Sequence, residues 1–176
     1  MKEVLVFLVD TFFSLLFFVF LLRLLLQWAR ADFRNPLSQA ILRLSNWLIM
    51  PLRRLLPPVG RIDTASVVAV LLVALAQVAA LSLVRGFGLP DGLDWLRLAG
   101  LEIVRTTLWV YFWAIFIYAL LSMVAPGTYS PATSLLESLC EPILGPIRRT
   151  VPPLGGLDLS PLWAGIAIQV LLILLR

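Results

Sequence analysis

The chain has 176 residues, of which 61% are hydrophobic and 14% charged, and its formal net charge is +4. It is more apolar than a typical soluble domain, in which about half of the residues are apolar. With no histidine and one cysteine, Cys140, it lacks the residues for histidine acid–base catalysis, disulfides and the common zinc and haem sites within one chain. We find no nucleophile–base constellation or phosphate-binding glycine loop, and we expect no catalytic residue, metal site or cofactor.

Four apolar runs approach the roughly 20 residues that a helix needs to cross a bilayer. In chain order they cover about 4–28, 64–84, 103–125 and 159–175. We expect the first to be an uncleaved anchor, since it is longer than the core of a signal peptide. The sequence therefore predicts an all-α membrane protein with four transmembrane helices.

One string of residues occurs twice, 95 positions apart, and each copy lies between two apolar runs. The copies read PLRRLLPPVGRID at 51–63 and PIRRTVPPLGGLD at 146–158. We predict a first repeat over 1–84, a linker over 85–102 and a second repeat over 103–176. Since each unit holds two spans, both units cross the membrane in the same direction, related by a pseudo-two-fold axis along the membrane normal.

Each copy is preceded by a helix-start signal, a capping residue followed by proline. The signals are Asn35-Pro36 and Ser130-Pro131. Leucine and isoleucine then recur at spacings of three and four, with polar residues opposite, which is typical of an amphipathic helix. We expect both helices to lie in the membrane interface.

The rest of each copy predicts a rigid turn into the next span. Prolines kink or end the helix, the Pro-Pro pair forces extended backbone, glycine permits a turn, and the aspartate caps the following helix. The interfacial segments therefore extend over 35–63 and 130–158. Their structural residues are Pro51, Pro57, Pro58, Gly60 and Asp63 in the first copy and Pro146, Pro152, Pro153, Gly155, Gly156 and Asp158 in the second.

Each copy also carries an arginine pair, Arg53 with Arg54 and Arg148 with Arg149. One interpretation is an anchor to anionic lipid headgroups; the other is a paired binding site, with the two aspartates, for a partner protein or an anionic ligand. We do not expect nucleic-acid binding, because the arginines lie in short segments beside apolar runs.

The connecting segments that hold the copies carry more arginines than the other side, so we expect them to be cytoplasmic and both termini external.

Two charges inside the spans are related by the repeat. Asp10 and Arg105 are 95 positions apart, at equivalent depths of equivalent helices. They could neutralise each other within the membrane, or each could extend to its nearby interface.

The repeated string resembles that of the YggT family of small integral membrane proteins. The pattern Pro-x-Arg-Arg-x-x-Pro-Pro-x-Gly-Gly-x-Asp is clearest in the second copy and continues to Pro161; in the first copy, Arg61 replaces the second glycine. The resemblance covers nearly the whole chain. It implies an association with osmotic or ion tolerance and with loci for division and envelope maintenance in bacteria. In chloroplast and cyanobacterial relatives it implies a role in assembling photosynthetic membrane complexes, including haem attachment to cytochrome b6.

Two functions are compatible with these features. The first is a non-enzymatic scaffold or assembly factor of the bacterial inner membrane, which docks membrane proteins or anionic lipids through the two copies. The second is a subunit or modulator of an ion or osmolyte pathway. Four spans enclose little space, so a pore would require a homo-oligomer.

Overall fold

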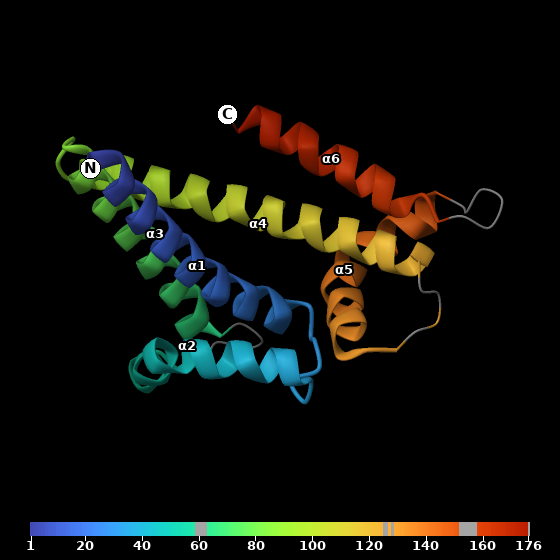
Figure 1. Cartoon of the computed structure of the whole chain (residues 1–176). Coiled ribbons are helices and arrows are strands. Elements are labelled where there is room, and N and C mark those ends of the chain that lie inside the picture. Colours follow the sequence, from blue (N-terminus) through green and yellow to red (C-terminus); the bar gives the residue numbers. More distant parts are fainter. Residues whose placement is uncertain (59–62, 125–126, 128, 152–157, 176) are drawn as a thin grey trace. The chain divides into compact units, whose positions relative to one another are not determined.

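The computed structural model describes residues 1–58, 63–124, 127, 129–151 and 158–175. Its described residues form helices and no strand (Figure 1). In chain order the helices are α1 (Lys2–Trp28), α2 (Pro36–Leu55), α3 (Thr64–Arg85), α4 (Gly92–Val124), α5 (Pro131–Thr150) and α6 (Ser160–Leu174). The all-helical prediction is confirmed for this part of the chain.

Three helices, α1, α3 and α4, are long and apolar enough to cross a membrane. The fourth apolar helix, α6, has 15 residues, a length of about 22 Å against a hydrocarbon core of about 30 Å. The fourth span therefore stays a prediction. The helix that contains the third predicted span is longer than expected, since α4 already starts at Gly92, within the segment predicted to be a linker.

The two predicted interfacial helices are present as α2 and α5, and their starts are capped as expected. The Asn35 side-chain oxygen accepts a hydrogen bond from the backbone N–H of Leu37 at 2.9 Å. Ser130 and Thr133 form a reciprocal capping box. Both helices continue past their internal prolines, Pro51 in α2 and Pro142 and Pro146 in α5.

Helix α2 leaves much of its apolar side exposed. Its Leu44, Trp47 and Met50 side chains are each about 60% exposed, whereas Ser38 and Ser45 are fully buried. A helix that turns small polar residues inward and large apolar residues outward fits a lipid environment better than water.

Residue contacts divide the described chain into two compact units. Unit 1 comprises 1–24 and 41–106, and unit 2 comprises 25–40 and 107–176. This division by contacts is distinct from the sequence repeats, so the repeat boundaries stay a prediction.

Within unit 1, α1 and α3 pack antiparallel. The Lys2 ammonium donates to the Arg85 carbonyl at 2.8 Å, and further along the pair Gln77 donates to Ser14 at 3.2 Å. The core between them is apolar and includes Phe17, Phe20, Leu21, Ala69, Val70 and Val73.

Within unit 2, α5 packs against α6. The Asn35 side-chain amide donates to the Pro131 carbonyl at 2.6 Å, so the capped starts of α2 and α5 are in contact.

Candidate functional site

In the first copy, the arginine that comes first in the pair binds the aspartate ten positions further along the chain. Arg53, in the last turn of α2, donates to both carboxylate oxygens of Asp63, with Nε–Oδ1 at 3.4 Å and Nη2–Oδ2 at 2.5 Å. Such two-bond pairing fixes direction as well as distance. The Asp63 side chain is 2% exposed and that of Arg53 46%, so the carboxylate is deeply placed while the guanidinium still reaches the surface.

The environment of Asp63 keeps it ionised. Burial alone raises its pKa, but hydrogen bonds from Arg53 and Ser66 and the charges of Arg53 and Arg23 outweigh burial, so its pKa lies below the ordinary value. The Ser66 hydroxyl lies 2.7 Å from the carboxylate. Asp63 is at the N-cap position of α3, yet its side chain makes no backbone capping bond. Its predicted position at the helix start is therefore confirmed, but the expected side-chain capping bond is absent, since Arg53 and Ser66 occupy the carboxylate.

A second arginine, which is buried, lies close to this pair. Arg23 of α1 is only 2% exposed. It donates to the Ser45 hydroxyl and to the Asn46 side-chain oxygen, each at 2.8 Å. From sequence, Arg23 was only a charge within an apolar run, because nothing local indicates that α2 folds back against it.

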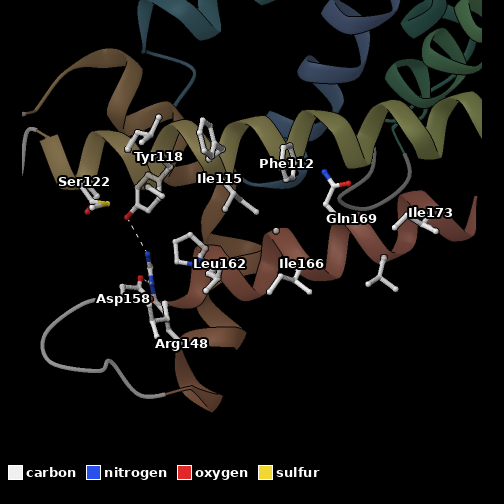
Figure 2. Close-up of a pocket in the computed structure, with 18 residues that line it drawn as sticks. Phe112, Ile115, Tyr118, Ser122, Arg148, Asp158, Leu162, Ile166, Gln169 and Ile173 are labelled. Carbon is white, nitrogen blue, oxygen red and sulfur yellow. Dashed lines mark hydrogen bonds and ion pairs between the residues drawn. The ribbon is translucent and has the colours of Figure 1, made fainter.

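In the second copy, the equivalent arginine binds the equivalent aspartate. Arg148 of α5 donates from Nε to Asp158 at 2.8 Å, from Nη1 to Glu141 at 3.0 Å and from Nη2 to the Tyr118 hydroxyl at 3.3 Å. Its guanidinium carbon also lies 5.8 Å from the centre of the Tyr118 ring. Figure 2 shows Arg148, Asp158 and Tyr118 together at one end of a groove.

This second pair is more exposed than the first, with side chains 32% exposed for Arg148, 42% for Asp158 and 57% for Glu141. Burial lowers the pKa of Arg148, but its bonds to Asp158 and Tyr118 outweigh burial and raise it. Burial raises the pKa of Asp158, and bonds from Ser160 and Arg148 lower it overall. Asp158 also accepts the backbone N–H of Ser160 at 2.9 Å, as predicted for a residue at the start of the next helix.

The repeat register relates the other members of the two clusters. A step of 95 residues takes Arg23 to Tyr118 and Asn46 to Glu141. We call Arg23, Asn46, Arg53 and Asp63 the first cluster, and Tyr118, Glu141, Arg148 and Asp158 the second cluster. The first cluster holds two arginines and one carboxylate, a formal charge of +1, and the second holds one arginine and two carboxylates, a charge of −1.

One of the two side-chain acceptors of Arg23 has a weaker equivalent in the second copy. The counterpart of Ser45, which binds Arg23, is Cys140. Cys140 is fully buried, and burial raises the pKa of its thiol to about 12. A protonated thiol is a weak acceptor and offers an arginine little.

The second arginine of each pair differs from the first. The side chains of Arg54 and Arg149 lie in the last turns of α2 and α5 and are exposed. Neither makes an ion pair or hydrogen bond to another described residue. Of the four predicted binding arginines, two therefore bind the aspartates of the repeated strings and two are exposed without such a partner among the described residues.

The remaining predicted residues fall in different places. Pro57 and Pro58 follow α2 and are exposed. Gly60, Pro152, Pro153, Gly155 and Gly156 lie outside the described residues. Asp10 accepts from the Gln77 amide at 3.4 Å, and its pairing with Arg105 stays a prediction.

A groove of about 830 Å³ runs between α4 and α6 of unit 2. It is lined mainly by apolar side chains, among them Ile115, Leu162, Ile166 and Ile173, with Gln169 along its length. Arg148 and Asp158 form its charged end (Figure 2). Pockets that bind small ligands commonly have this volume and this mixture of apolar walls and few polar groups.

Its long apolar helices and outward-facing apolar side chains define the chain as a helical membrane protein. The CCB3/YggT family model matches residues 2–84 and 98–176. The chain belongs to this family.

The relatives that the chain resembles support this membership. An uncharacterized protein of Pseudomonas aeruginosa is 40% identical over 167 residues, covering 94% of this chain and 85% of the relative. An uncharacterized protein from the proC 3′ region of Vibrio alginolyticus is 40% identical over 164 residues, covering 93% and 88%. The uncharacterized protein YggT of Escherichia coli K12 is 38% identical over 159 residues, covering 90% and 81%. No solved structure matches the chain.

Proposed function

We propose that the protein is a non-enzymatic scaffold or assembly factor of the bacterial inner membrane, with four spans in two parallel repeats. The repeated segments lie on the cytoplasmic surface and the termini outside. Membership in the CCB3/YggT family supports a membrane role of this kind. The arginine distribution supports the orientation.

The proposal rests on one observation: within each arginine pair, one side chain binds an aspartate and the other is exposed. Arg53 and Arg148 bind the aspartates at the end of each repeated string. Arg54 and Arg149, one position further on, are exposed. A guanidinium presented beside a rigid ion pair is suited to carboxylate or phosphate groups, since its donors form a planar fork. The exposed arginines would therefore dock acidic segments of membrane-protein partners or anionic lipid headgroups.

The test compares the two kinds of arginine in the full-length protein. The Arg54→Ala/Arg149→Ala variant should lose crosslinked partners, or retained phosphatidylglycerol, while keeping the stability of the wild type. Loss of crosslinked partners alone identifies protein docking, and loss of phosphatidylglycerol alone identifies lipid docking. The Arg53→Ala/Arg148→Ala variant is the matched control and should lose stability first. If the Arg54→Ala/Arg149→Ala variant keeps all partners and lipids, the docking role of these arginines is wrong.

One observation favours the second candidate, a subunit or modulator of an ion or osmolyte pathway. Gln77 of α3 lies within reach of Asp10 and Ser14 of α1, so three polar side chains meet inside two long apolar helices. Gln77 is 3% exposed, and its side-chain oxygen accepts no hydrogen bond from the described residues. Polar groups inside a span often mark an ion route. This candidate predicts that Gln77→Leu alters ion flux in proteoliposomes, whereas the scaffold predicts unchanged flux.

A further inference from the structure

We propose that the groove between α4 and α6 binds one aminophospholipid, with an acyl chain along the helices and a phosphoethanolamine headgroup at the Arg148–Asp158 end. The site uses residues other than the exposed arginines of the proposed docking surface, so each can fail without the other.

The shape of the groove fits an acyl chain. Its charged end is formed where α6 begins, and its lining continues along α6 to Ile173. Helix α6 has 15 residues, a length of about 22 Å, and one bilayer leaflet contributes about 15 Å of hydrocarbon. The apolar walls therefore extend far enough for a chain that enters from one leaflet.

Gly165 keeps the middle of the groove open. A Cβ atom built on Gly165 would lie 3.9 Å from the ring of Phe112 on α4, an ordinary contact distance. A longer side chain at this position would have to occupy the space between the two helices. The glycine thus provides a direct way to fill the groove without touching its charged end.

The charged end selects the headgroup. Arg148 uses three of its five N–H donors on Asp158, Glu141 and Tyr118. Its remaining donors can bind a phosphate. The adjacent Asp158 and Glu141 are both partly exposed and give the second cluster a net negative charge.

A headgroup with only negative charge would meet this net negative charge and be disfavoured. A phosphate with a primary ammonium beside it matches an arginine flanked by two carboxylates. Its N–H groups can also donate to the carboxylates, which a quaternary ammonium cannot do. Charge complementarity therefore favours phosphatidylethanolamine over phosphatidylcholine and phosphatidylglycerol.

The experiment uses full-length protein, delipidated in detergent and incubated separately with the dioleoyl forms of these three lipids, with bound lipid counted by native mass spectrometry. Phosphatidylethanolamine should bind about tenfold more tightly than phosphatidylglycerol, with phosphatidylcholine intermediate, because one charged hydrogen bond discriminates by about this factor. The comparison is made in the full-length Arg54→Ala/Arg149→Ala variant, so that phosphatidylglycerol held by the exposed arginines is not counted. Equal or tighter binding of phosphatidylglycerol in this variant would overturn the proposal.

Two variants on α6 locate the binding site. Gly165→Leu should reduce phosphatidylethanolamine binding about tenfold by filling the groove. Ala167→Leu introduces the same side chain at an exposed position two residues away, outside the lining, and should bind as the wild type does. If both variants bind equally, or if Gly165→Leu instead abolishes self-association with lipid binding intact, the groove is not a lipid site.

A third variant tests the headgroup assignment. Asp158→Asn should remove most of the preference for phosphatidylethanolamine over phosphatidylglycerol, because the end of the groove loses one negative charge. Thermal unfolding of this variant establishes that it is folded under the binding conditions. An unchanged preference in the folded variant would rule out ammonium recognition at this end.

Discussion

The first and second clusters contain the same arginine–aspartate pair in different surroundings. The Asp63 carboxylate is 2% exposed and lies near a second arginine, whereas the Asp158 carboxylate is 42% exposed at the end of a groove. The bond across the turn is the part that both copies share. Two differences together give the clusters opposite net charge: Arg23 in one copy corresponds to Tyr118 in the other, and Asn46 corresponds to Glu141.

This difference indicates separate roles for the two copies. In the first, the arginines and the carboxylate hold α1, α2 and the start of α3 together inside unit 1. In the second, a similar ion pair is accessible and lies beside apolar walls, where a ligand can reach it. The second copy is therefore the better place to seek binding, and the first the better place to seek stability.

The largest expected effect comes from replacing the aspartates. Asp63→Asn should lower the free energy of unfolding by about 3 kcal/mol, because it leaves Arg53 and Arg23 without a buried counter-charge. Asp158→Asn should cost about 1 kcal/mol or less, because its pair is exposed to solvent. Chemical denaturation in mixed micelles measures both values. Equal losses in the two variants would contradict the difference between the copies.

Acid should weaken the first cluster in the same way as Asp63→Asn. Folding lowers the pKa of Asp63, so its contribution to stability is complete above its ordinary pKa of 3.8 and is lost as pH falls through the lower folded pKa. Thermal unfolding from about pH 6 to about pH 2 should show this loss, with a smaller loss in Asp63→Asn. The pKa of Asp158 is also lowered, so its protonation should cause a further loss of stability as the pH falls. An acid loss in Asp63→Asn as large as in the wild type would contradict the assignment.

Arg23 and Tyr118, which the apolar helices contribute to the clusters, should contribute unequally to the free energy of unfolding. Arg23→Tyr introduces the residue type of the second copy and should cost about 2 kcal/mol, since the buried Ser45 and the half-buried Asn46 lose charged hydrogen bonds. Tyr118→Phe removes one longer bond and should cost about 0.5 kcal/mol. Arg23→Lys serves as the control and should fall between, because it keeps the charge without the planar fork. A greater loss in Tyr118→Phe than in Arg23→Tyr would reverse this ranking.

The smallest expected change in stability comes from a substitution at Gly145, next to the Glu141 side chain. A Cβ atom on Gly145 would lie 2.9 Å from the Glu141 carboxylate, so Gly145→Ala must displace that flexible side chain from Arg148. We expect the stability change to stay within about 0.5 kcal/mol, because the gain in helix propensity is offset. In a Glu141→Ala background the same change should gain about 1 kcal/mol. Chemical denaturation measures the free energy of unfolding in both backgrounds. If Gly145→Ala stabilises the two backgrounds equally, displacement of Glu141 does not offset the gain in helix propensity.

Local chemistry explains which predictions were confirmed. Capping depends on residues within one turn, so Asn35 and Ser130 could be recognised from their own sequence context. The start of α2 and the bounds of α3 followed from the capping signal and the apolar pattern in the same way. The start of α4 was missed because residues 92–102 are less apolar than the span that follows, although they continue the same helix.

The candidate site could be predicted only in part. The repeated string identified Arg53, Asp63, Arg148 and Asp158, but it did not indicate that Asp63 binds Arg53 and Ser66 in place of backbone N–H groups. It also did not indicate which arginine of each pair binds the aspartate. Glu141 was only a polar position on an amphipathic helix. Its bond to Arg148 depends on side-chain reach across two helical turns, which periodicity does not specify.

By itself, the sequence determined the helical class, the capped starts of α2 and α5, and the family, because these depend on composition, local hydrogen bonding and an ordered motif. Only the tertiary structure decided which arginine of each pair binds the aspartate, that Arg23 lies in the first cluster, and that the second cluster ends a groove. The physical reason is that the partners come from different helices. Their distances and burial are set by packing, which places residues far apart in the chain within reach of one another.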